Sequence, residues 1–322
     1  MSEKTSFLRI IKRIMTIKEA GVFLILIVLM AFLSIFAESF LTLDNILTII
    51  LNMSFIAIMT YGMTLVIITA GIDLSVGSVL GLSGVIIGVL VIDYGWNSFL
   101  AVIVALGVAA LMGFTNGILI TKARLVPFVS TLGMLSIGRG LAYVLSGGWP
   151  ISGFSESFTF HGLGKLGIFP MPVVYMAILG VIMHFFLKNT IIGRRIYAVG
   201  GNPEAATLMG IKKDRILILV YTLSGFFAGF SGFLMTSWLG VSQANAGQGY
   251  ELDVIAATII GGTSLMGGEG SILGSLLGAA IMAVLRNGLI LLEVSSFWQQ
   301  VTIGAVIIFA IMFDQFRRVR VS

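Results

Sequence analysis

The sequence predicts an all-α protein that crosses a membrane about ten times, and three observations support this fold class. Hydrophobic residues make up 58% of the 322 residues and charged residues only 10%, whereas roughly 25% of an ordinary soluble domain is charged. The apolar residues gather in stretches of roughly 20, the length that a helix needs to span a bilayer. Most Lys and Arg residues lie between these stretches, as is typical of cytoplasmic segments of membrane proteins.

Ten apolar stretches are expected to cross the membrane. The first is interpreted as a retained helix rather than a signal peptide, because no convincing cleavage site follows it. The stretches are 21–37, 46–70, 79–92, 99–120, 127–145, 172–187, 216–235, 252–265, 272–292 and 297–313. This order places the basic clusters on one side of the membrane, with both termini in the cytoplasm. Because the clusters flank apolar spans, they indicate membrane orientation rather than binding of nucleic acid. The clusters are 4–18, 122–124, 188–215 and 317–320.

The polar interval 188–215 is predicted to contain a short helix over residues 203–209. Asn202 is a favourable N-cap, and Pro203 suits the first helical position. Gly210 suits the left-handed residue past the end. So short a helix is about 10 Å long and is marginal alone in water, so another structure must hold it.

One face of this short helix is small and apolar. Ala205, Ala206 and Met209 lie three and four positions apart, so they share that face. A helix face of this kind fits a groove on another protein. We therefore predict that it contacts a soluble partner.

Three motifs resemble those of the ribose-type sugar permeases, the membrane subunits of bacterial ABC importers. They are GIDLSVGS at 71–78, YAVGGNPEAA at 197–206 followed by Gly210 and Ile211, and GYELD at 249–253 with GGTSL at 261–265. The resemblance covers about 45–313. It implies that 1–322 is a single transmembrane permease domain and that 188–215 is its cytoplasmic coupling loop.

The resemblance also implies a function and partners. A periplasmic sugar-binding protein would deliver a monosaccharide to a pair of permease copies in the lipid of the inner membrane. A separate cytoplasmic ABC ATPase would bind ATP and Mg²⁺ and push on the coupling loop, so this chain itself is expected to hold no cofactor and no metal. The coupling residues that the resemblance implies are Asn202, Pro203, Glu204, Ala205, Ala206, Met209, Gly210 and Ile211.

Asp73 is the most informative charged residue, because a charge in an apolar stretch costs roughly 3 kcal/mol near the bilayer centre. We expect the chain to break at Gly71 and Asp73 to cap a new helix that starts near Ser75. Such a break can also line a translocation pathway. Polar side chains within the apolar stretches are pathway candidates, although most should bond within the bundle. The candidates are Asn52, Thr60, Asp73, Ser75, Asn116, Thr263 and Ser264.

Glu251 and Asp253 lie at the predicted outer end of a span, where acids stabilise a helix N-terminus. They could equally meet a basic patch on the sugar-binding protein. Arg139 is expected to extend toward the outer surface or to pair with an acid. Similar short motifs in the two halves suggest an inverted repeat, with spans two to five related to spans seven to ten.

Other function classes lack their sequence signatures. No G-x-x-x-x-G-K-[ST] motif is present, so the chain is not expected to be the ATPase. His161 and His184 are isolated from other metal ligands, and no nucleophile and base occur together, so we do not expect an enzyme. The alternative is an ion-coupled secondary transporter, whose signature would be paired intramembrane acids. The sequence does not name the sugar.

Overall fold

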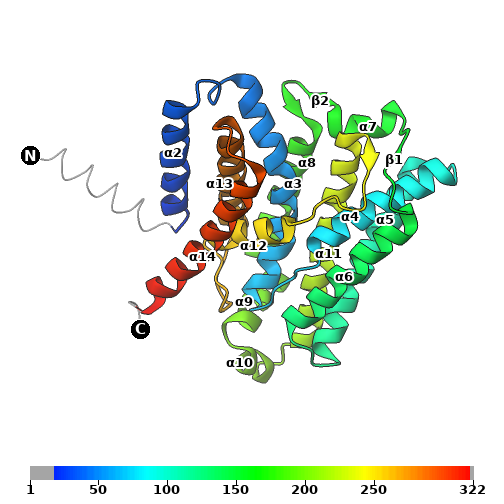
Figure 1. The fold of residues 1–322 in the computed structure, drawn as a ribbon. Coiled ribbons are helices and arrows are strands. Elements are labelled where there is room, and N and C mark those ends of the chain that lie inside the picture. The colour runs from blue at the N-terminus through cyan, green and yellow to red at the C-terminus, as the bar shows by residue number, and fades with distance from the viewer. Residues whose placement is uncertain (1–17, 320–322) are drawn as a thin grey trace, which may run out of the picture.

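The computed structural model describes residues 18–319, and helices make up nearly all of it (Figure 1). Its helices are α2 (Lys18–Phe36), α3 (Leu43–Ile68), α4 (Val76–Gly88), the π-helix η1 (Val89–Asp93), α5 (Ser98–Thr121), α6 (Pro127–Ser146), α7 (Glu156–Leu163), α8 (Met171–Asn189), α9 (Ile191–Gly201), α10 (Pro203–Leu208), α11 (Lys213–Leu239), α12 (Tyr250–Ile260), α13 (Ile272–Leu291) and α14 (Ser296–Val319). Two antiparallel pairs of very short strands join β1 (Ile151–Ser152) to β4 (Val241–Ser242) and β2 (Lys165–Leu166) to β3 (Phe169–Pro170). The all-α prediction is confirmed.

Eight of the described helical segments are long and apolar enough to cross a membrane: α2, α3, α4 with η1, α5, α6, α8, α11 and α13. The prediction of a full span over 252–265 is wrong, because α12 has only 11 residues and is about 16 Å long. Among the described residues, α14 contains the shorter apolar stretch Ser296–Phe309. The count of ten crossings and the inverted repeat stay predictions.

Helix α11 forms the centre of the bundle and packs against α3, α4 and α5. Glycine allows this close approach. A Cβ atom on Gly225 would lie 2.3 Å from the carbonyl oxygen of Ala109 in α5, and one on Gly232 would lie 2.3 Å from that of Leu80 in α4. Small residues at helix contacts are typical of membrane bundles, where van der Waals packing drives association.

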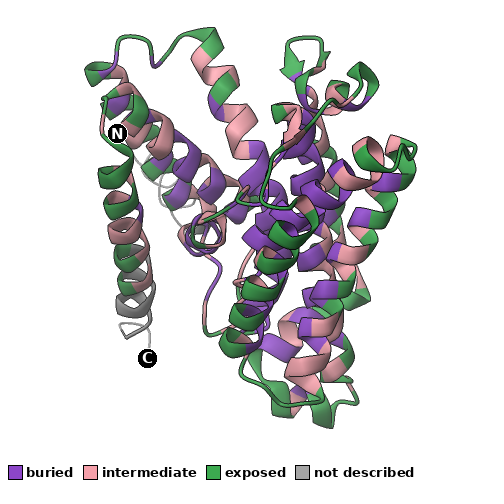
Figure 2. Cartoon of the chain, turned by 45° about the vertical axis from the view of Figure 1, so that its right-hand side comes forward, coloured by how far each residue is buried: buried purple, intermediate pink, exposed green. Residues whose placement is uncertain are grey.

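The outer helices expose apolar side chains, whereas the buried residues concentrate in the interior of the bundle (Figure 2). Phe23 of α2, Ile103 of α5 and Ile178 of α8 are each about half exposed. Apolar exposure on this scale around a bundle fits a lipid surrounding. The chain is therefore a multi-pass membrane protein.

The two ends of the bundle differ in their connections. Helices α9 and α10 protrude at one end, which we call the α10 end, while α7 and the short strands lie at the opposite end, the α7 end (Figure 1). The start of α2 and the end of α14 both face the α10 end (Figure 1). Two irregular segments also interrupt the helical bundle: residues 69–75 after α3, and residues 261–271 after α12.

Candidate coupling and translocation sites

The short helix α10 begins as the sequence predicts. The side chain of Asn202 accepts hydrogen bonds from the backbone N–H groups of Glu204, at 3.1 Å, and of Ala205, at 2.9 Å. Pro203 occupies the first turn. The cap satisfies two of the amide groups that every helix N-terminus leaves free.

Helix α10 ends at Leu208, one residue earlier than predicted, and closes with a Schellman motif in which Gly210 is the left-handed residue, as predicted. Gly210 has a φ of +80°, and its N–H donates to the carbonyl of Thr207 at 2.9 Å. The N–H of Ile211 donates to the carbonyl of Ala206 at 3.0 Å, which completes the motif. Ile211 then packs against the core of the bundle, so both ends of α10 are fixed.

The two sides of α10 have different surroundings. Ala206 is fully buried within its own chain, so the expectation that it contacts a partner is wrong in this structure. Leu208 and Met209 are 90% and 71% exposed. Sequence reasoning missed Leu208, although it lies about 200° around the helix from Ala206 and so had to face away from it. The free apolar surface of α10 is therefore formed by Leu208 and Met209.

Helix α9 connects α10 to both irregular segments of the bundle. Gly200 packs so tightly that a Cβ atom there would lie 1.7 Å from the carbonyl oxygen of Ile68, at the end of α3. The same carbonyl accepts a hydrogen bond from the N–H of Gly268 at 2.8 Å. The hydroxyl of Tyr197 donates to the carbonyl of Gly270 at 2.7 Å. Helix α9 therefore contacts residues 261–271 and the last residue of α3, which leads into residues 69–75.

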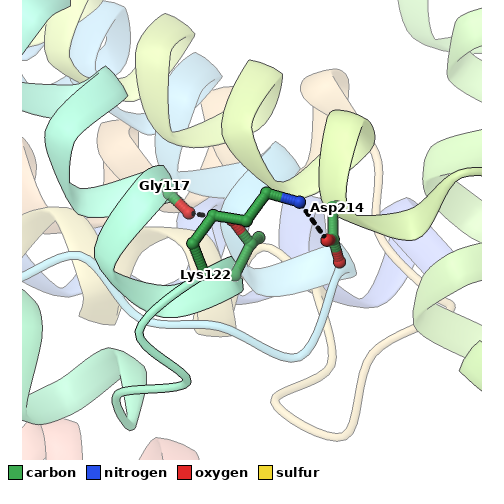
Figure 3. A network of polar contacts seen from close by, with 4 residues as sticks. Gly117, Lys122 and Asp214 are labelled. Atoms are coloured by element: carbon green, nitrogen blue, oxygen red, sulfur yellow. Dashed lines mark hydrogen bonds and ion pairs between the residues drawn. The ribbon is translucent and has the colours of Figure 1, made fainter.

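A basic hollow of about 230 Å³ lies beside α10. Arg195, Lys212 and Arg215 contribute its charged lining. The adjacent acid, Asp214, is bound instead by the ammonium group of Lys122 at 2.8 Å (Figure 3). The three lining cations form no ion pair with another described residue, so the hollow can receive an acidic group from outside.

The break after α3 is organised by Asp73, as expected. This fully buried carboxylate accepts hydrogen bonds from the N–H of Ser75, at 3.0 Å, from the Ser75 hydroxyl, at 2.6 Å, and from the Ser224 hydroxyl of α11, at 2.8 Å. Helix α4 starts directly after Ser75. The side chain of Asn116 donates to the Ser75 hydroxyl at 3.1 Å, which extends the polar network to α5.

The predicted pathway residues lie mostly inside the subunit. Thr60, Asp73, Ser75, Asn116, Thr263 and Ser264 are all at most 2% exposed, and only Asn52 is partly exposed. Asp73, Ser75 and Asn116 come together in one network, while the Thr60 hydroxyl bonds to its own helix and Thr263 lies beside Ser275. Their role in a pathway stays a prediction.

Of the two alternatives for Asp253, the structure bears out a position in the first turn of a helix, and burial of the side chain argues against contact with a sugar-binding protein. Its carboxylate is fully buried and forms an ion pair with Arg286 of α13. Glu251 is partly buried, with one carboxylate oxygen enclosed beside Gly77. Sequence reasoning missed Arg286, although a lone arginine within the apolar stretch 272–292 requires an acidic partner.

Arg139 is partly exposed, and its charge attracts that of Glu251, although no salt bridge joins the two groups. Its guanidinium group donates to the carbonyl oxygens of Ala244 and Ala246, the second at 2.8 Å, and to that of Gly77 at 3.3 Å. Ala244 and Ala246 belong to the irregular segment before α12, and Gly77 lies in the first turn of α4. Arg139 therefore holds the segment that precedes α12 against α4.

A cavity of about 500 Å³ near the α7 end was not expected from the sequence. Its lining is mainly apolar and aromatic, from α5, α7, α8 and α11, with His161 and Tyr175 hydrogen-bonded at 2.7 Å. Burial lowers the pKa of the His161 imidazole, so the ring is neutral at pH 7. No group of three potential metal ligands occurs among residues 18–319.

Comparison with known proteins identifies the family. The chain is 42% identical over 301 residues to the ribose import permease protein of Bacillus subtilis (strain 168), covering 92% of this chain and 93% of that protein. It is 39% identical to the fructose import permease protein of Rhizobium meliloti (93% and 86% covered) and 35% identical to the galactose/methyl galactoside import permease protein of Escherichia coli (strain K12; 94% and 96% covered). No solved structure matches the chain. The family model described as the permease component of the branched-chain amino acid transport system matches residues 45–311, and the chain belongs to this family of transport permeases.

Proposed function

We propose that the chain is the permease subunit of an ATP-driven importer that carries a monosaccharide across the bacterial inner membrane. The observation that carries this proposal is the similarity, over 92% to 94% of the chain, to permeases named for ribose, fructose and galactose. The family description names branched-chain amino acids, but these closer relatives favour a sugar. The same similarity gives no support to a secondary transporter.

The proposed importer needs three further components. A second permease copy completes the pathway, a periplasmic binding protein delivers the sugar, and a cytoplasmic ABC ATPase binds ATP and Mg²⁺. The α10 end then faces the cytoplasm, together with both termini, because Lys122, Lys188 and the cations of 194–215 gather there. The permease itself requires no cofactor in this scheme.

The α10 end offers a surface of suitable chemistry for the ATPase. The exposed apolar Leu208 and Met209 project from a helix whose ends are both fixed. The basic hollow lined by Arg195 and Arg215 lies directly beside them. We propose that segment 188–215 is the coupling loop and that its partner presents an apolar groove bordered by acidic residues.

Reconstitution tests the proposal. The chain is purified together with its ABC ATPase and binding protein and placed in proteoliposomes. Uptake of radiolabelled ribose, fructose, allose and galactose is then measured with and without ATP. We expect uptake of at least one sugar only when all components and ATP are present. Uptake by the permease alone, driven by an ion gradient, would contradict the proposal, as would co-purification with no ATP-binding subunit.

A further inference from the structure

The segment between β4 and α12, residues 243–249, enters the bundle instead of crossing its end (Figure 1). It descends along α4: the Ser242 hydroxyl donates to the carbonyl of Gly84 at 2.7 Å, and a Cβ atom on Gly77 would lie 2.4 Å from the carbonyl oxygen of Gly247. Gly77 lies 16 positions before Asp93, the last residue of η1. This separation corresponds to about 24 Å along the helix.

The start of α12 gives a second measure of this depth. Asp253 pairs with Arg286, which lies five positions before the end of α13 at Leu291, or about 8 Å of helix. Both measures place the segment and the start of α12 below the α7 end and within a hydrocarbon layer of about 30 Å. The segment is therefore irregular backbone at membrane depth.

This segment carries three amide side chains toward the outside of the subunit. Asn245 and Gln248 are exposed, and Gln243 is partly exposed. The hydrogen bonds of the segment among described residues come from its backbone turns and from Arg139 behind it. None of the three amide side chains has a hydrogen-bond partner among those residues. The backbone is thus held from inside, while the amides face away from the chain.

Lipid does not suit such a surface. Irregular backbone within the hydrocarbon layer occurs only where protein buries it or where it lines a water-filled cavity. A protein cover would have to supply partners for all three amides, whereas water supplies them directly. A side-chain amide both donates and accepts hydrogen bonds, as a sugar hydroxyl also does.

We propose that Gln243, Asn245 and Gln248 line the water-filled translocation pathway and hydrogen-bond the hydroxyl groups of a passing monosaccharide. The identity of the substrate rests on the function proposed above, but the water-filled character of the surface does not. Helix α12 starts at the same place, and discontinuous helices of this kind also occur at the binding sites of other transport proteins.

Cysteine labelling tests the water-filled surface, because the natural chain contains no cysteine. Asn245→Cys and Gln248→Cys are made separately, with Ile178→Cys as control, since Ile178 is 52% exposed in the middle of α8. The assembled complex in proteoliposomes is treated with a cationic water-soluble methanethiosulfonate. We expect labelling at 245 and 248 to be at least tenfold faster than at 178. Equally slow labelling, or a spontaneous disulfide between two copies that blocks labelling, overturns the proposal.

Uptake tests the contact with sugar. Gln248→Leu should reduce uptake at least tenfold while the ATPase still co-purifies, and Gln248→Asn should retain most of the uptake because it keeps an amide. Unchanged uptake in both Gln248→Leu and Asn245→Leu overturns the sugar contact. If the natural chain imports none of the sugars, the proposed function fails. The labelling pattern still decides whether the surface that carries Asn245 and Gln248 is in contact with water.

Discussion

At the scale of single residues, the ion pairs Asp253–Arg286 and Asp214–Lys122 show how much surroundings matter. The carboxylate of Asp253 is fully buried among helices, whereas the side chains of Lys122 and Asp214 are 62% and 35% exposed. A buried charge that loses its partner remains unpaired in a medium of low dielectric constant. An exposed charge is solvated by water instead, so its ion pair contributes little.

We therefore predict that Arg286→Met lowers the free energy of unfolding by about 3 kcal/mol, and that Lys122→Met costs less than about 1 kcal/mol. Thermal unfolding of the purified protein in detergent, compared with the natural chain, measures both effects. The double variant Asp253→Leu/Arg286→Met is the control and should recover most of the loss. A double variant no more stable than Arg286→Met would show that the pair acts through packing rather than charge.

Residue roles that depend on local sequence were predictable. Asn202 caps α10 and Asp73 binds the N–H of Ser75 directly before α4, because each side chain acts on amide groups two or three residues away. Roles that depend on distant segments were not. The partner of Asp253 lies 33 residues further along the chain, and Ala206 is buried because α10 folds back on its own bundle.

At the scale of elements, the contacts of α9 with the end of α3 and with residues 261–271 offer a route by which motion of α10 would reach the bundle. Gly200 touches the carbonyl of Ile68, whereas a Cβ atom on the adjacent Gly201 would have no neighbour within 4 Å. Both residues are glycines of the same helix. They differ in what they contact.

We predict that Gly200→Ala lowers the number of sugar molecules imported per ATP hydrolysed by at least tenfold, because the extra methyl group displaces α9 from Ile68. Gly201→Ala is the matched control and should keep the natural ratio. Uptake and phosphate release in the same proteoliposomes give the ratio, and co-purification of the ATPase shows that the complex still assembles. Equal ratios in both variants would remove Gly200 from the coupling route.

The exposed side of α10 gives a separate prediction. Leu208→Asp should prevent co-purification of the ATPase or reduce ATP-dependent uptake at least tenfold, because it places a charge where the proposed apolar groove must close. Leu208→Met keeps an apolar side chain and should behave as the natural chain does. Natural uptake by Leu208→Asp would argue against α10 as the docking element.

The predicted span over residues 252–265 is wrong because the prediction used composition alone. Residues 252–265 have the apolar composition of a span, and composition was the basis of that prediction. The helix ends at Ile260 because Gly261 and Gly262 follow, and Gly262 has a φ of +90°. Helix-stop signals of this kind predict the end of the short helix. The entry of residues 243–249 into the bundle is not predictable in this way, because it depends on tertiary packing.

At the scale of the whole molecule, apolar stretches and basic clusters predicted most of the architecture. Helix length and hydropathy are properties of continuous sequence, so the eight long spans are predictable from the sequence alone. The cavity beside His161 and the buried polar networks could not, because they form between segments far apart in the chain.

The orientation of the molecule is open to a direct test. Leu208→Cys lies at the α10 end, and Trp149→Cys, at a residue 77% exposed, lies in the loop after α6. In spheroplasts, a membrane-impermeant thiol reagent added outside should label position 149 and leave position 208 unlabelled until the cells are broken. The reverse pattern would place α10 outside the cell and contradict the assignment of the coupling loop.

The division of α10 into a buried and an exposed side has an evolutionary consequence. Ala206 and Ile211 pack into the core and attach the helix to its own subunit, while the exposed side chains of Leu208 and Met209 take no part in that attachment. In the proposed importer, substitutions on the outer side can therefore change which ATPase is bound without disturbing the attachment of α10 to the bundle. Related importers could exchange ATPases by drift at a few surface positions, and an engineered hybrid would need to graft only those.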